Sequence, residues 1–165
     1  PDLMAYCHLS AAPVGRFLID LHGGSSLGYG ASDALCAALQ IINHLQDCGD
    51  DYRTLDRVYL PQDWMTEAGV EVENLADRST SPALKRVIDW ALKGIDQLLA
   101  DAEPLPAGLY SPRLALEAAV IIRISQVLSW RLGRNDPLAS RIELSKSDLG
   151  LCFLSGMAKG ALARW

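Results

Sequence analysis

Residues 40–61 read QIINHLQDCGDDYRTLDRVYLP and predict the end of a long amphipathic helix followed by a polar loop. At about 100° per residue, four polar positions of this helix share an arc of roughly 80°. They carry two amides and two carboxylates: Gln40, Asn43, Asp47 and Asp51. The other side carries apolar residues at helical spacing, namely Leu35, Ala38, Leu39, Ile42 and Leu45. We therefore expect a helix over residues 31–51, buried on one side and lined with oxygen donors on the other.

Two interpretations of the polar face follow. Two carboxylates one helical turn apart repel each other unless a cation lies between them, and hard cations such as Mg²⁺ prefer oxygen ligands. The face is thus a candidate metal and diphosphate site, to which Arg57 would add a guanidinium for a phosphate oxygen. The alternative is a solvated acidic face, the commoner arrangement for an Asp pair near a helix end, with Arg57 in a surface ion pair.

Composition narrows the classes of protein. The chain has 165 residues, of which 50% are hydrophobic, so we expect a single globular domain over residues 1–165. A formal charge of -5 argues against a nucleic-acid partner, because such surfaces need a basic footprint. The longest apolar runs are a few residues, far below the ~20 needed to cross a bilayer.

Cysteines and histidines form no metal motif. The four cysteines lack a CxxC pair and have apolar neighbours, so we expect buried free thiols in a reducing compartment: Cys7, Cys36, Cys48 and Cys152. The three histidines are too far apart for an HExxH-type zinc site, although His44 borders the carboxylate face.

The rest of the chain has helical periodicity and no stretch that alternates with period two. We expect a helix over residues 3–21 that Pro13 bends or breaks, then a flexible loop over residues 22–30. Ser32 or Asp33 is the expected N-cap of the carboxylate helix. Four more helices are predicted: one from Pro61 to a stop at Gly69, one over 82–102, one over 112–132, and one over 147–163 capped by Ser147 or Asp148. A break is expected at 103–108.

Residues 6–16 read YCHLSAAPVGR and lie about thirty residues before the two aspartates, which RVYLP at 57–61 follows. The first stretch looks like the YCxxxAxxVG segment of the squalene and phytoene synthase family, and the carboxylate helix looks like that family's second aspartate-rich motif. The resemblance continues to Trp165. Within the family, residues 31–61 are most similar to the bacterial hydroxysqualene synthases of hopanoid biosynthesis.

The resemblance implies an all-helical class I isoprenoid synthase bundle of the terpenoid synthase-like type. In that bundle, two aspartate-rich helices hold a diphosphate through Mg²⁺ beside an apolar cavity. Residues 1–165 would be the C-terminal part of one such domain, lacking its N-terminal helices and the first aspartate-rich motif. On its own this part is expected to be inactive.

The resemblance also assigns residues to roles. Asp47 and Asp51 match the outer aspartates of the motif and, with Asn43, would bind the metal. Tyr6 matches the tyrosine of the first segment and would act beside a carbocation. Contacts with the substrate or its diphosphate are implied for Gln40, Asn43, Arg57, Tyr59, Lys146 and Val14. Gln46 stands where the family often has arginine, as in the hydroxysqualene subgroup.

The implied reaction converts presqualene diphosphate and water to hydroxysqualene and diphosphate, with Mg²⁺ and without a nicotinamide cofactor. Two alternatives remain open. One is head-to-head condensation of prenyl diphosphates, as in presqualene diphosphate or phytoene synthases. The other is a helical interaction protein without catalysis. We expect a cytoplasmic location, prenyl or presqualene diphosphate as partners, and a peripheral membrane contact for product release. The oligomeric state stays open.

Overall fold

The computed structural model describes residues 2–162, which form helices and loops without a β-strand. The α-helices are α1 (Asp2–Ser10), α2 (Ala12–Leu21), α3 (Tyr29–Leu55), α4 (Gln62–Ala68), α5 (Pro82–Ala102), α6 (Leu105–Gly108), α7 (Pro112–Leu132) and α8 (Lys146–Leu162). Two 3-10 helices, η1 (Ser26–Gly28) and η2 (Val72–Ala76), lie in the loops.

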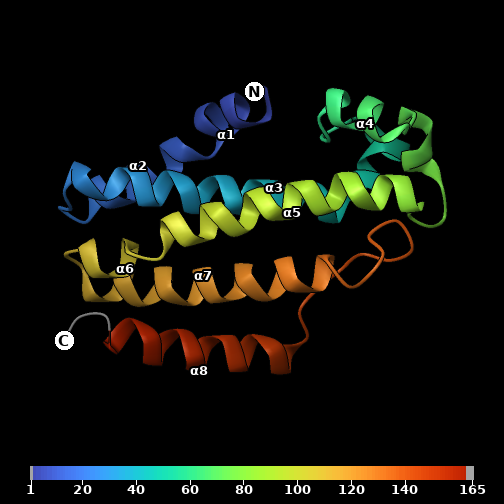
Figure 1. Cartoon of the computed structure of the whole chain (residues 1–165). Coiled ribbons are helices and arrows are strands. Elements are labelled where there is room, and N and C mark those ends of the chain that lie inside the picture. The colour runs from blue at the N-terminus through green and yellow to red at the C-terminus, as the bar shows by residue number, and fades with distance from the viewer. Residues whose placement is uncertain (1, 163–165) are drawn as a thin grey trace.

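The long helices run side by side in layers (Figure 1). α3 contacts α2, α5 and α7, and α8 packs on α7. Figure 1 places α1 and α4 together on one side of α3, and α7 and α8 on the other. This arrangement makes α3 the element that joins the two sides of the molecule.

The break between α1 and α2 lies at Ala11, two residues before the proline that the sequence marks as a helix breaker. Pro13 occupies the first turn of α2, where its missing N–H needs no partner. α3 begins at Tyr29 with Gly28 as its N-cap, so the N-cap prediction at Ser32 or Asp33 was wrong. The Asp33 carboxylate instead accepts a bond from Arg16 Nε at 2.9 Å, which ties α3 to α2.

Serine side chains cap the N-termini of α5 and α7. Ser81 and Ser111 each accept a hydrogen bond from the backbone N–H of the residue three positions later. Gly69 ends α4 with φ +71°, as the sequence predicts. Residues 103–108 are not simply a break, since they contain the short helix α6.

The N-cap prediction for α8 was also wrong. The helix begins at Lys146, and Ser145 and Asp148 bond reciprocally: the Ser145 N–H donates to Asp148 Oδ2 at 2.8 Å, and the Asp148 N–H donates to Ser145 Oγ at 3.2 Å. Ser145 is therefore the capping side chain, as in a capping box. Ala163, the predicted last residue of this helix, lies outside the described residues.

The core confirms the predicted apolar face of α3. Leu35, Ala38, Ile42 and Leu45 are buried, and Leu39 packs against them while partly exposed. All four cysteines are free thiols, three of them buried, as expected. Among the described residues, no helix is both long enough and apolar enough to cross a membrane.

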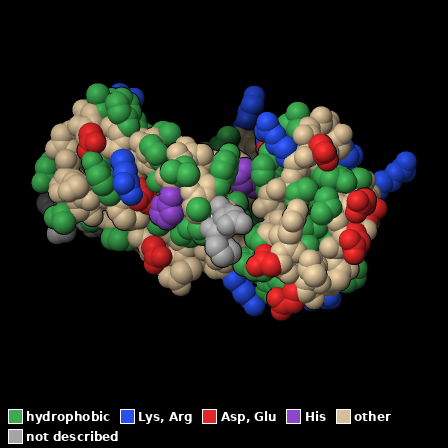
Figure 2. Space-filling model, turned by 90° about the horizontal axis from the view of Figure 1, so that it is seen from above, with side chains coloured by type: hydrophobic (Ala, Val, Ile, Leu, Met, Phe, Trp, Pro, Cys, Tyr) green, Lys and Arg blue, Asp and Glu red, His purple; other side chains and the backbone are tan. Residues whose placement is uncertain are grey.

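The surface is uneven in character. Large apolar side chains stay exposed along α1 and α2: Leu9, Val14, Phe17, Leu18 and Leu21. Seen from above, acidic side chains gather at the end of the molecule formed by α4 and η2 (Figure 2). This end accounts for part of the net negative charge.

Candidate functional site

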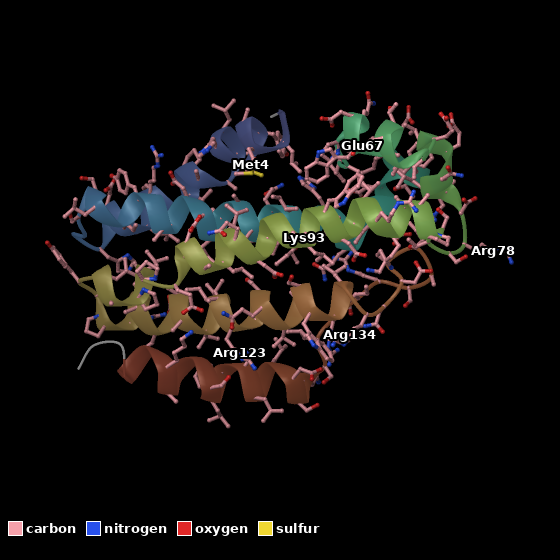
Figure 3. The ribbon with its side chains drawn as sticks, viewed as in Figure 1. Met4, Glu67, Arg78, Lys93, Arg123 and Arg134 are labelled. Carbon is pink, nitrogen blue, oxygen red and sulfur yellow. The ribbon has the colours of Figure 1, made fainter. Side chains whose placement is uncertain are left out.

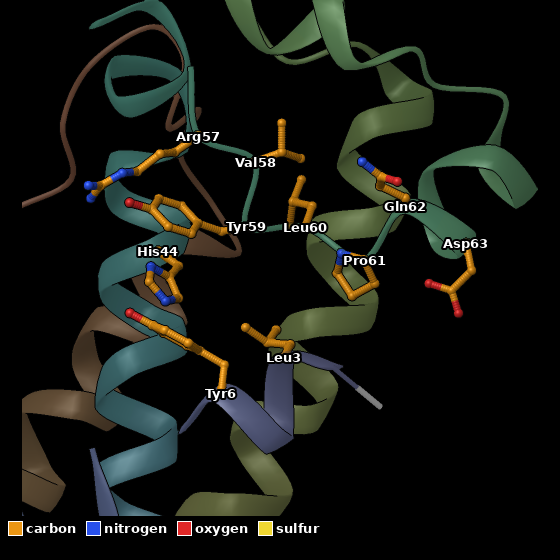
Figure 4. Close-up of a pocket in the computed structure, with 10 residues that line it drawn as sticks. All are labelled: Leu3, Tyr6, His44, Arg57, Val58, Tyr59, Leu60, Pro61, Gln62 and Asp63. Atoms are coloured by element: carbon orange, nitrogen blue, oxygen red, sulfur yellow. The ribbon is translucent and has the colours of Figure 1, made fainter. Parts of the chain in front are cut away.

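A cavity of about 820 Å³ opens where α1 faces the loop that follows α3. Its lining comes from three places: the start of α1, one position of α3 and the segment from that loop into α4. The residues are Leu3, Tyr6, His44, Arg57, Val58, Tyr59, Leu60, Pro61, Gln62 and Asp63 (Figure 4). The polar segment after α3 thus turns back along the helix and forms a wall beside it.

Three aromatic rings stack along one side of this cavity (Figure 4). The rings of His44 and Tyr59 lie nearly parallel, with centroids 3.8 Å apart and an interplanar angle of 18°. The Tyr6 ring lies 5.8 Å from His44 and is tilted by 38°. The stack brings residues 6, 44 and 59 together, and it presents aromatic faces and edges to the cavity.

Hydrogen bonds connect this stack to the polar face of α3. Gln40 Nε2 lies 3.1 Å from His44 Nε2, and the Tyr59 hydroxyl donates to Asp51 Oδ2 at 2.6 Å. That bond to Asp51, helped by burial, raises the pKa of Tyr59 and keeps its proton in place. Burial lowers the pKa of His44, and the Asp51 charge opposes the shift. Asp51 is therefore fixed by the phenol of the stack.

Asp47 has a different partner, because its Oδ1 lies 2.5 Å from Nη1 of Arg141. This contact lacks hydrogen-bond geometry, and Oδ1 is buried with no hydrogen-bond partner within the described part of the chain. Burial raises the pKa of Asp47, and the charges of Asp51 and Asp50 add to the rise while Arg141 opposes it. One oxygen of this partly exposed carboxylate is thus buried without a hydrogen bond, with the Arg141 guanidinium as its charged neighbour.

Other predicted site residues lie apart from the aromatic stack. Val14 lines a second cavity of about 230 Å³, which is almost entirely apolar and is bounded by residues of α2, α3, α6 and α7. Asn43 is exposed on α3, and Lys146 is exposed at the first position of α8. The cation that reaches Asp47 is Arg141. The roles assigned to these residues stay predictions.

Sequence reasoning placed His44 at the border of the carboxylate face without giving it a role, and it missed Arg141 altogether. His44 lies one helical turn after Gln40, and that spacing was a usable signal for their contact. Arg141 had no such signal, because it comes from the loop between α7 and α8, 94 positions away from Asp47 along the chain.

The donors on α3 fit one side of a magnesium site. A buried carboxylate oxygen without a hydrogen bond, such as Asp47 Oδ1, is the type of ligand that a hard cation takes, and Asp51 lies one turn further on. Within residues 2–162, no group of three or more His, Cys, Asp or Glu is placed to hold a metal ion. Within the described residues the donors thus form no complete metal site, and their role as magnesium ligands stays a prediction.

Known proteins match most of the length of this chain. A family model described as Squalene/phytoene synthase matches residues 1–148. The chain is 43% identical over 163 residues to the hydroxysqualene synthase of Rhodopseudomonas palustris, a match that covers 99% of this chain and 56% of that protein. The chain spans about half the length of the curated relatives it matches.

Solved structures share the fold. A dehydrosqualene synthase crystallised with a ligand superimposes with a TM-score of 0.81 at 21% identity, over 99% of this chain and 58% of that one. The squalene synthase HpnC from Alicyclobacillus acidocaldarius gives a TM-score of 0.64 at 27% identity, over 99% of this chain and 50% of that one. These matches confirm the all-helical, terpenoid synthase-like fold predicted from the sequence.

Proposed function

Because this chain belongs to the squalene/phytoene synthase family, we propose that its 165 residues are the C-terminal part of a hydroxysqualene synthase. The complete enzyme converts presqualene diphosphate and water to hydroxysqualene and inorganic diphosphate. The carbon–oxygen bond to the diphosphate breaks, the resulting carbocation rearranges, and water adds to it and loses a proton. A facing aspartate helix from the remainder of the enzyme completes the metal site.

One observation carries the proposal: a hydrogen bond joins the carboxylate face of α3 to the wall of an aromatic-lined cavity. The Tyr59 hydroxyl, which belongs to the wall, donates to Asp51, which belongs to the face. A site that ionises a prenyl diphosphate needs this juxtaposition, since the leaving diphosphate requires charged ligands while the cation requires an apolar and aromatic surface.

The roles of the charged residues follow from their positions. Asp47 and Asp51, with Asn43, hold Mg²⁺, which supplies positive charge for the departing diphosphate. Arg57 lines the cavity beside Tyr59 and adds a cationic donor for phosphate oxygens. Its hydrogen bond to the Tyr59 oxygen raises the pKa of the Arg57 guanidinium, which therefore stays protonated.

The uncharged residues protect and stabilise the carbocation. The faces of Tyr6, His44 and Tyr59 attract a positive charge through their π electrons. Leu3, Leu60 and their apolar neighbours keep bulk water away from that part of the cavity. The apolar cavity at Val14, between α2 and α7, accepts hydrocarbon chain.

The experiment gives the intact enzyme presqualene diphosphate and farnesyl diphosphate in separate reactions with Mg²⁺ and analyses the products by mass spectrometry. We expect hydroxysqualene from presqualene diphosphate, without a nicotinamide cofactor. Turnover of farnesyl diphosphate alone would favour head-to-head condensation instead. Absence of turnover of either diphosphate, together with no stabilisation by Mg²⁺ and diphosphate, would favour a helical interaction protein.

A further inference from the structure

The Asp47 carboxylate, one oxygen of which is buried, is held by a cation of the protein itself. Arg141 Nη1 lies 2.5 Å from Asp47 Oδ1, although the contact lacks the geometry of a hydrogen bond. The Arg141 side chain is 49% exposed, and Asp47 is 26% exposed. The guanidinium therefore approaches the carboxylate from solvent, where it is free to leave.

The backbone that carries Arg141 is anchored next to this contact. The buried Gln46, the residue before Asp47 on α3, donates from Nε2 to the carbonyl oxygen of Ile142 at 2.5 Å. The Ile142 side chain is buried in the core. The loop is thus fixed to α3 through its backbone at 142, while only the side chain of Arg141 reaches over the carboxylate.

Arg141 also has a second acidic partner to which it can turn. Its Nε lies 3.1 Å from Glu143 Oε1, on the exposed side of the same loop. The guanidinium can leave Asp47 and keep a carboxylate contact. Leaving therefore costs less than it would for an arginine with a single partner.

We propose that Arg141 is a competing cation at Asp47, a residue that holds the carboxylate in the metal-free protein and is displaced when a divalent cation binds there. The inference rests on the proposed function only in taking Asp47 as a metal ligand. Two cations on the same buried oxygen repel each other, so the two contacts exclude one another. Only molecules in which Arg141 has left Asp47 can bind the metal there. The apparent affinity for the metal is therefore reduced in proportion to the fraction of molecules in which Arg141 occupies Asp47.

The test measures binding of Mn²⁺, a probe for the site, from the electron paramagnetic resonance signal of the free ion. In the intact enzyme, Arg141→Gln should bind Mn²⁺ about 1.5- to fivefold more tightly than the unmodified protein, the range expected for loss of a half-exposed ion pair. Arg141→Lys keeps the charge and should stay close to the unmodified protein.

A matched control removes an arginine of the same loop that contacts no carboxylate within residues 2–162. Arg134, labelled just past α7 in Figure 3, has its guanidinium carbon 4.2 Å from the centroid of the Trp130 ring. Arg134→Gln should therefore leave the affinity unchanged. In an Asp47→Asn background, Arg141→Gln should have no effect either.

Equal or weaker Mn²⁺ binding by Arg141→Gln would overturn the proposal, as would the absence of binding in every variant. A tightening shared by Arg141→Lys would also overturn it, because charge would then not be the cause. The result is separable from the proposed function. Tighter binding by Arg141→Gln in a protein that does not turn over presqualene diphosphate rejects the reaction alone, and unchanged binding in an active enzyme rejects the role of Arg141 alone.

Discussion

Gly156 and Gly150 lie on the same helix, α8, yet alanine at each should have opposite effects on stability. A Cβ at Gly156 would lie 2.6 Å from the Val120 Cα of α7 and 3.0 Å from its backbone nitrogen. Ordinary contacts begin near 3.4 Å, so α8 would have to move outward, because backbone atoms of α7 cannot rotate aside. A Cβ at Gly150 meets nothing within 4 Å.

The two magnitudes follow from this difference. Replacing glycine by alanine inside a helix stabilises by about 0.5–1 kcal/mol, and Gly150→Ala should gain that amount. Gly156→Ala has the same gain but suffers overpacking of about 1–3 kcal/mol, which leaves a net loss of up to about 2.5 kcal/mol. Because the gain is common to both variants, their free energies of unfolding should differ by the overpacking cost, about 1–3 kcal/mol.

Urea unfolding followed by far-ultraviolet circular dichroism measures both values. Equal stability of the two variants, or a more stable Gly156→Ala, would refute the close packing of α8 on α7. The position of α8 matters for the site because the loop that ends at Ser145 carries Arg141 to Asp47. Gly156→Ala should therefore also disturb Mn²⁺ binding, while Gly150→Ala should not.

Two further predictions concern α3. Burial raises the pKa of Cys48 from 9.0 to about 11, so the unfolded chain loses this proton first as the pH rises. The stabilisation by the protonated Cys48 thiol is complete below pH 9 and is lost towards pH 11. The difference in unfolding free energy between the unmodified chain and Cys48→Ala should therefore fall by about 2 kcal/mol from pH 8 to pH 11. A constant difference would show that the thiol is not buried. Ile42→Asp, which puts a carboxylate at a fully buried position, should cost more than about 4 kcal/mol in urea unfolding, whereas Asn43→Asp at the exposed neighbouring position should stay within about 1 kcal/mol. Similar losses in both variants would mean that the two faces of α3 are wrongly assigned.

Local patterns predicted most of the fold. The apolar spacing of α3, the proline in the first turn of α2 and the starts of α5 at Pro82 and α7 at Pro112 each depend on residues within one or two turns, so the sequence was enough to place them. The start of α3 was misplaced because Asp33, a good capping residue, binds Arg16 of a neighbouring helix instead. A tertiary contact overrode a local preference.

The candidate site likewise contains contacts that the sequence predicted and contacts that it did not. The grouping of Tyr6, Tyr59 and Asp51 agrees with the prediction, since the motifs that contain them were visible in the sequence. The Asp47–Arg141 contact depends on how the loop after α7 folds back onto α3, and neither periodicity nor spacing encodes that path. A long-range ion pair between two ordinary surface residue types gives no sequence signal.

The most direct test of the proposed site is the release of inorganic diphosphate from presqualene diphosphate by the intact enzyme with Mg²⁺, compared between Asp47→Asn and Asp56→Asn. Asp56 is exposed just past α3 in the left-handed conformation that asparagine tolerates, so it provides the same change of charge away from the site. We predict that Asp47→Asn loses about 10²-fold or more of the rate with an unchanged circular dichroism spectrum, and that Asp56→Asn stays within about twofold. Retention of the rate by Asp47→Asn would contradict a diphosphate site on the carboxylate face of α3.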